Sequence, residues 1–107
     1  MKIEYISEEE TKSIVGTFYI GSMRVRFDEL VRVFGLPNRG ESPDQKTSVQ
    51  WFITINKIPI TIYDWKNTKN VLLIEKWNVG GYKKEDFKLV EKALEEHNVK
   101  ILDKYPI

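Results

Sequence analysis

The chain has 107 residues, and its 17 lysines and arginines against 16 aspartates and glutamates give a formal charge of +1. That balance gives no reason to expect duplex DNA or an anionic membrane as a partner. A content of 41% hydrophobic and 31% charged residues is typical of a globular protein, and the length predicts one domain over residues 1–107. The absence of cysteine excludes disulfides, thiolate metal sites and cysteine nucleophiles.

No part of the sequence approaches the roughly 20 apolar residues that a membrane-spanning helix needs. The first ten residues, ending in Glu8-Glu9-Glu10, contain no apolar segment of the kind found in signal peptides. We therefore expect a cytoplasmic protein without a membrane partner.

The first half of the chain predicts a strand followed by a helix. The segment from Ile14 to Val25 is rich in β-branched and aromatic residues, so we expect a strand near 15–20, with a bend or bulge at Gly21 and Ser22. Apolar residues then recur with the spacing of one helical face. Gly35 and Pro37 are typical of a helix end, which predicts a helix over 27–34.

Period-two alternation from Thr47 predicts a strand whose apolar face includes Trp51, and a tight turn at Asn56-Lys57 leads into a second strand over 58–62. Pro59 lacks an N–H donor, so this strand or its first residues should lie at a sheet edge. The remaining segments predict a strand over 71–79, a helix over 83–97 and a closing strand over 99–105. The expected order is β-α-β-β-β-α-β, an α+β fold with an antiparallel sheet and two helices.

No pattern of catalytic residues is evident. Acid–base catalysis needs paired titratable groups, and no pair with a recognisable spacing occurs. The single histidine, His97, is at the end of a predicted helix, where a cation is favoured by the helix dipole. One histidine without thiols also makes a zinc site improbable. We therefore expect neither an enzyme, nor a metal site, nor a cofactor.

Two regions could instead bind an anion. All four arginines lie between Arg24 and Arg39, either as an ordinary solvated face or as half of an anion site built from Arg24, Arg26 and Arg39. Gly80-Gly81 lacks the spacing of a phosphate-binding loop. It is either a tight connection or the start of a helix whose free N–H groups bind an anion.

The aromatic residues after the second strand offer a planar surface. Tyr63 and Trp65 alternate away from the apolar residues of 58–62 and should lie on the other face of the sheet. If a helix covers that face they belong to the core, and if it is open they can stack on a planar ligand. Trp77 and Asn78 are neighbours in a predicted strand, so their side chains point to opposite faces of the sheet and cannot both be buried on one face. The candidate ligand-binding residues are Arg24, Arg26, Arg39, Tyr63, Trp65, Lys66, Trp77, Asn78, Gly80, Gly81 and Tyr82.

Four segments in order, FDELVRVFGLP, DQKTSVQWFITI, ITIYDWK and EKWNVGGY, resemble a family of small phage-encoded domains over about residues 23–95. In that family a helix ends in Phe-Gly-x-Pro and Trp-x-Ile/Val-Gly-Gly precedes the last helix. Members often have histidine where Asn78 stands, so a role that needs histidine there is in doubt.

The resemblance implies a virus or prophage origin but no particular activity. By analogy with other small phage proteins, which are often inhibitors of bacterial immunity, we expect an anti-defence role in the host cytoplasm. We expect a protein that sequesters a cyclic-nucleotide or nucleotide-derived immune signal without cleaving it. The alternatives are an inhibitor that binds a host defence protein, such as an anti-CRISPR protein, and a binder of single-stranded nucleic acid. The near-zero net charge disfavours the last. A homo-oligomer is also expected, because pockets in small domains often form between subunits.

Overall fold

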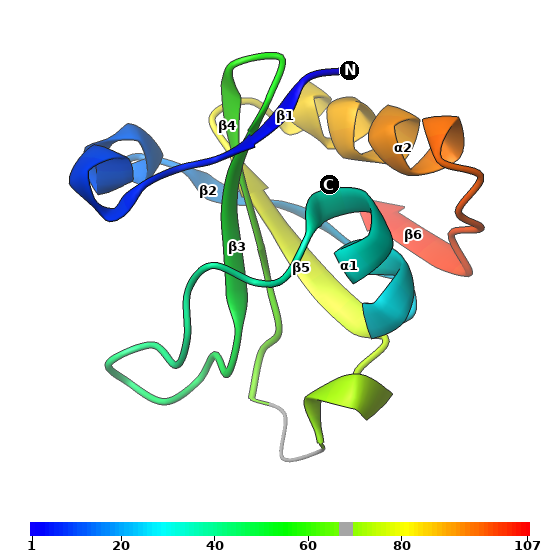
Figure 1. Cartoon of the computed structure of the whole chain (residues 1–107), viewed down its shortest axis with the longest axis horizontal. Coiled ribbons are helices and arrows are strands. Elements are labelled where there is room, and N and C mark those ends of the chain that lie inside the picture. The colour runs from blue at the N-terminus through cyan, green and yellow to red at the C-terminus, as the bar shows by residue number, and fades with distance from the viewer. Residues whose placement is uncertain (67–69) are drawn as a thin grey trace.

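The computed structural model describes residues 1–66 and 70–107, and its six strands form one antiparallel sheet in the order β1-β3-β4-β5-β2-β6 (Figure 1). The strands are β1 (Ile3–Tyr5), β2 (Phe18–Arg24), β3 (Gln50–Ile55), β4 (Ile58–Tyr63), β5 (Lys76–Gly81) and β6 (Asp103–Pro106). The helices are α1 (Phe27–Phe34) and α2 (Phe87–Glu96), with 3-10 segments η1 (Glu8–Ile14), η2 (Val71–Leu73) and η3 (Lys84–Asp86). The predicted α+β class with an antiparallel sheet and two α-helices is confirmed.

Local sequence signals placed several boundaries correctly. α1 covers the predicted 27–34, and Gly35 ends it with a φ of 82°, a conformation that glycine adopts without strain. Asn56 and Lys57 have φ of 52° and 69°, as a two-residue hairpin turn of type I′ requires, and the turn joins β3 to β4. The pairing of β2 with β5 shifts register between Tyr19 and Gly21, which is the predicted bulge.

The structure differs from the prediction at several elements. The strand expected near 15–20 is β2 at Phe18–Arg24, the helix expected over 83–97 starts as η3 and becomes α2 only at Phe87, and the strand expected over 99–105 is limited to β6 at Asp103–Pro106. β1 was not predicted, and it adds an edge strand beside β3. The segment predicted as one strand over 71–79 begins as η2, because the Asn70 side chain accepts a hydrogen bond from the Leu72 amide and starts a helical turn. β5 therefore begins at Lys76 and continues through Gly80 and Gly81, the residues expected to end it.

Pro59 lies near the start of β4, in the interior of the strand order. β5 pairs with β4 only from Thr61 to Tyr63, so the first residues of β4 lack a strand partner on that side. This local edge accommodates the missing N–H donor of proline, as expected.

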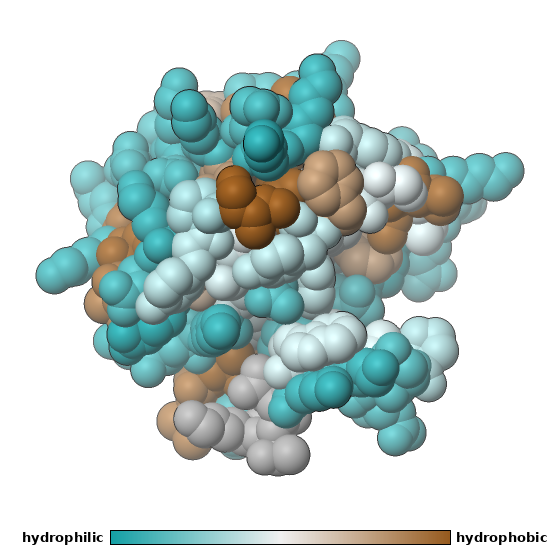
Figure 2. All heavy atoms as spheres, turned by 180° about the vertical axis from the view of Figure 1, so that it is seen from behind, coloured by the Kyte–Doolittle hydropathy of each residue, from teal (hydrophilic) through white to brown (hydrophobic). Residues whose placement is uncertain are grey.

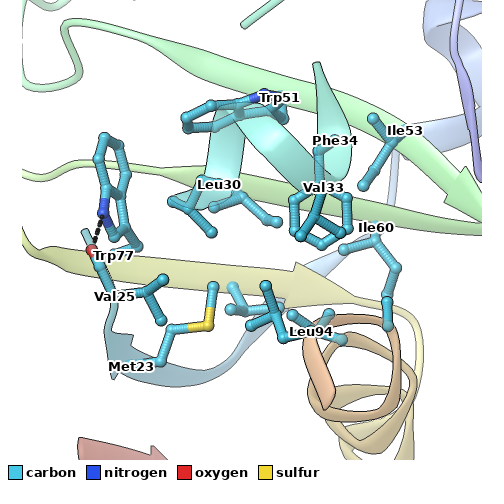
Figure 3. Packing of buried hydrophobic residues seen from close by; sticks show 14 of the residues in the cluster. Met23, Val25, Leu30, Val33, Phe34, Trp51, Ile53, Ile60, Trp77 and Leu94 are labelled. Carbon is cyan, nitrogen blue, oxygen red and sulfur yellow. Dashed lines mark hydrogen bonds between the residues drawn. The ribbon is translucent and has the colours of Figure 1, made fainter. Parts of the chain in front are cut away.

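Both α-helices pack on one face of the sheet, and two tryptophans attach α1 to it (Figure 3). Trp77 Nε1 donates to the Val25 carbonyl just before α1 at 3.0 Å, and Trp51 Nε1 donates to the Gly35 carbonyl just after it at 2.8 Å. The two indoles meet edge to face with centroids 5.2 Å apart. Burial of both rings with their N–H groups satisfied makes this contact a centre of the core.

Candidate functional site

The other face of the sheet, called here the open face, is not covered by either α-helix. Its side chains alternate with the core residues along the central strands, and η1 lies against β4 at one end. Figure 2 views the molecule from behind and shows a centre of intermediate hydropathy with an apolar area beside it, and further apolar areas among hydrophilic side chains towards the left and right margins. The open face comprises Tyr19, Ser22, Arg24, Gln50, Phe52, Thr54, Thr61, Tyr63, Lys76 and Asn78.

A hollow of about 410 Å³ lies on this face, lined by Tyr19, Trp65, Lys76 and Asn78. We call it the Trp65 hollow. β2 supplies the tyrosine, β5 supplies the lysine and the amide, and the turn after β4 supplies the tryptophan. Two of the predicted residues, Trp65 and Asn78, thus meet in one concave site, which combines a stacking surface, a positive charge and a neutral hydrogen-bonding group.

Trp65 is 48% exposed, in contrast to the other two tryptophans, which have no exposed surface. The ammonium groups of Lys46 and Lys66 lie 5.6 and 5.9 Å from its ring centroid, within cation–π range. The predicted residue Lys66 is therefore part of the surroundings of Trp65. The three groups form a positively charged aromatic surface at the edge of the hollow.

A buried carboxylate fixes the turn that carries Trp65. Asp64 has no exposed surface, and its Oδ1 accepts hydrogen bonds from the backbone N–H groups of Ser48 and Val49 at 2.8 and 3.0 Å. The Lys66 amide also donates to the Lys46 carbonyl. These bonds join the end of β4 to the segment before β3, so Trp65 stands on a constrained turn.

Tyr63 lies across from Asn78 in the β4–β5 pairing, next to the hollow. Burial raises the pKa of its phenol above the ordinary value, and the neighbouring Tyr19 raises it further. The Tyr63 hydroxyl is therefore protonated at neutral pH and is a neutral hydrogen-bonding group. The predicted position of Tyr63 on the face opposite Ile60 and Ile62 is confirmed.

The predicted arginine cluster is not assembled. Arg24 is the strand partner of Lys76, and its guanidinium is paired with Asp103 at 2.8 Å. Arg26 pairs with Asp28 at 3.0 Å. Arg39 stacks over Phe52 with its guanidinium carbon 5.0 Å from the ring centroid and donates to backbone carbonyls. Only Arg24 lies beside the Trp65 hollow, so the three side chains do not form one anion site.

Three further parts of the predicted ligand-binding set have a structural role in the fold instead. Trp77 is fully buried and its N–H is satisfied, so it belongs to the core and cannot face a ligand. Gly80 and Gly81 lie inside β5 and do not start a helix; the backbone N–H of Lys83 instead meets the Asp86 carboxylate at 3.2 Å. The Tyr82 hydroxyl lies at the Ser13 and Val15 carbonyls and holds η1 in place.

The prediction missed Tyr19 and Lys76. Alternation from Trp77 would have placed Lys76 on the same face as Asn78, had Trp77 been assigned to the core. Tyr19 was harder to find, because the bulge beside it interrupts the alternation of β2 and hides which face each residue takes.

Among the residues that the structure describes, no group of three or more histidine, aspartate or glutamate side chains is placed to hold a metal ion. No helix within 1–66 and 70–107 is both long and apolar enough to cross a membrane. Comparison with protein-family models, with curated proteins and with solved structures finds no match to this chain.

Proposed function

We propose that the protein binds a small nucleotide-type ligand in the Trp65 hollow. The observation that carries this proposal is the convergence, in one concavity, of an exposed indole from the turn after β4 with a lysine and an amide from β5. A planar base stacks favourably on an aromatic ring, by about 1–3 kcal/mol in single-strand binders. Lys76, with Lys46 and Lys66 near the indole, provides positive charge for a phosphate.

We propose binding without turnover. Among the residues that the structure describes, the side chains that line the hollow offer stacking, one ammonium, one phenol and one amide. This set recognises and orients a ligand, whereas general acid–base catalysis would need a pair of groups with pKa values adjusted for proton transfer.

The motif resemblance adds a biological setting to this proposal. A phage protein that binds a nucleotide-derived signal in the host cytoplasm would lower the free concentration of that signal and so blunt a defence response. A second copy of the chain is a further part of the proposal, because the hollow is open on one side and a homo-oligomer would enclose the ligand more fully.

Isothermal titration against cyclic dinucleotides, cyclic trinucleotides and cyclic ADP-ribose isomers tests the proposal. We expect heat with at least one of them, accompanied by a change in tryptophan fluorescence, since only Trp65 is exposed. Lys76→Gln should weaken binding, while the matched control Lys92→Gln, on the exposed side of α2, should not. Absence of heat with every compound would reject the proposal.

A protein-binding inhibitor is the second candidate, and the surface of η2 favours it. Leu72 and Leu73 are 68% and 67% exposed and line a shallow depression with Phe27 and Arg26. Apolar anchors beside an arginine are typical of protein interfaces. A stoichiometric host protein retained by the wild type and by Trp65→Ala, and lost in a Leu72→Asp/Leu73→Asp variant, would support this function over the first.

A further inference from the structure

A second hollow of about 270 Å³ adjoins the Trp65 hollow on the open face. Tyr19 lines both of them, and Tyr63 of the second is the strand partner of Asn78 in the first, so the two hollows lie side by side. We call it the neutral hollow, and the residues that matter here are Phe18, Tyr19, Gln50, Phe52, Thr61 and Tyr63.

The chemistry of the neutral hollow differs from that of its neighbour. Among the described residues, none of the side chains that line it is charged. Phe18 and Phe52 line it with aromatic rings, of which Phe52 also carries the Arg39 guanidinium 5.0 Å from its centroid. Gln50, Thr61 and Tyr63 offer an amide and two hydroxyls. The Gln50 amide nitrogen donates to the Gly40 carbonyl at 3.2 Å, which fixes the side chain and leaves its oxygen as an acceptor. The Tyr63 phenol is a neutral hydrogen-bonding group at neutral pH, as any tyrosine with an ordinary or a raised pKa is.

A glycine of β5 gives room to one of the side chains that line the neutral hollow. Thr61 pairs with Gly80, and a Cβ placed on Gly80 would clash with the Thr61 Oγ1. Glycine at this position therefore leaves space for the Thr61 side chain, which lines the neutral hollow. Along β5 the order is Lys76, Asn78, Gly80, so the surface runs from a charged end to an uncharged end.

Resting on the proposed function, we infer that the ligand is a phosphorylated nucleoside held in one direction. Its uncharged base occupies the neutral hollow, and its phosphate lies at the end that carries Lys76 and the lysines around Trp65. Aromatic rings with neutral donors and acceptors match the faces and edges of a base, and ammonium groups match a phosphate. In a dinucleotide the second base would stack on Trp65.

Titrations with adenosine, adenosine monophosphate and cyclic di-AMP, and with the corresponding guanosine compounds, measure separately what the neutral hollow and the Lys76 end contribute to binding. We expect the nucleoside to bind weakly and independently of salt, and the phosphate to add affinity that salt weakens. Lys76→Gln should remove the phosphate gain and leave nucleoside binding unchanged. Tyr63→Phe and Gln50→Leu should each weaken nucleoside and nucleotide by about threefold to tenfold, the value of one hydrogen bond, without changing the salt dependence.

Amide spectra recorded by NMR supply the control for folding and locate the ligand. Unchanged spectra of the free variants would show that Tyr63→Phe and Gln50→Leu keep the fold, and the conservative tyrosine variant suffices if the glutamine variant unfolds. The ligand should shift the Gln50 side-chain amide together with the Trp65 indole. If a nucleotide shifts the NMR signal of the Trp65 indole but its affinity is the same for Tyr63→Phe as for the wild type, this inference is overturned and the proposed function stands. Absence of binding by every nucleotide would overturn both.

Discussion

The face of the sheet under α1 and α2 and the open face carry alternate residues of the same strands, yet they use aromatic side chains in different ways. On the covered face Trp51 and Trp77 are fully buried, and each N–H meets a backbone carbonyl at one end of α1. On the open face Trp65 is half exposed between two lysines. The difference indicates that a tryptophan acquires its role from the element packed over it, since residue type alone does not distinguish the two cases.

Removal of a large side chain should distinguish the two faces most strongly. Trp77→Ala leaves a cavity in the core and deprives the Val25 carbonyl of its donor, so we expect a loss of about 3–5 kcal/mol in the free energy of unfolding. Trp65→Ala should cost about 1 kcal/mol or less, because its ring is half in solvent. Urea denaturation followed by far-ultraviolet circular dichroism measures both variants, and equal losses would contradict the assignment of the two faces.

The sequence predicted the covered face better than the open one, and the reason is physical. Hydrophobic periodicity reports which residues turn towards a core, so α1, β3 and β4 were found together with the position of Trp51. The hollows depend on the register between β2, β4 and β5, which are far apart in the chain. No local pattern specifies that Tyr19 of β2 lies beside Trp65 and Asn78. The bulge in β2 conceals the relation further.

The prediction that three arginines form one anion site was wrong for a related reason. Arg24, Arg26 and Arg39 are close in sequence, but α1 and part of the connection to β3 lie between Arg39 and the other two. Each also has a local partner, an aspartate for the first two and the Phe52 ring for the third. Proximity along a chain is therefore a weak guide to a shared anion site.

Substitutions of Asp64 test whether the turn that carries Trp65 is held as firmly as the core. Asp64→Ala removes the acceptor of two backbone amides that are partly buried, and we expect a loss of about 1–3 kcal/mol in the free energy of unfolding. Asp64→Asn is the matched control, because its side-chain oxygen can accept both bonds, and it should remain close to wild type. Chemical denaturation gives the stabilities, and acrylamide quenching of Trp65 should rise only in the alanine variant.

Gly80 allows a smaller test of how closely the strands approach on the open face. A methyl group at this position meets the Thr61 Oγ1, so Gly80→Ala should destabilise the fold by about 1–2 kcal/mol. Adding Thr61→Ala removes the atom in conflict and should recover part of that loss. A double variant no more stable than Gly80→Ala alone would show that the strain lies in the β5 backbone and not in this contact.

The smallest expected effect is the contribution of Tyr63, on the open face, to the pH dependence of the free energy of unfolding. Burial, with the neighbouring Tyr19, raises the pKa of Tyr63 above its ordinary value of 10.0, so the folded state retains this proton at a pH where the unfolded chain loses it. The stabilisation is complete below about pH 10 and is lost as the pH rises through the folded-state value. Tyr63→Phe should therefore make the free energy of unfolding fall less steeply with pH above pH 10. Urea denaturation at a series of alkaline pH values measures this slope, with Tyr105→Phe, an exposed tyrosine on β6, as control. Parallel slopes for wild type and Tyr63→Phe would mean that the phenol is as well solvated as an unfolded one, which would contradict its burial beside Tyr19.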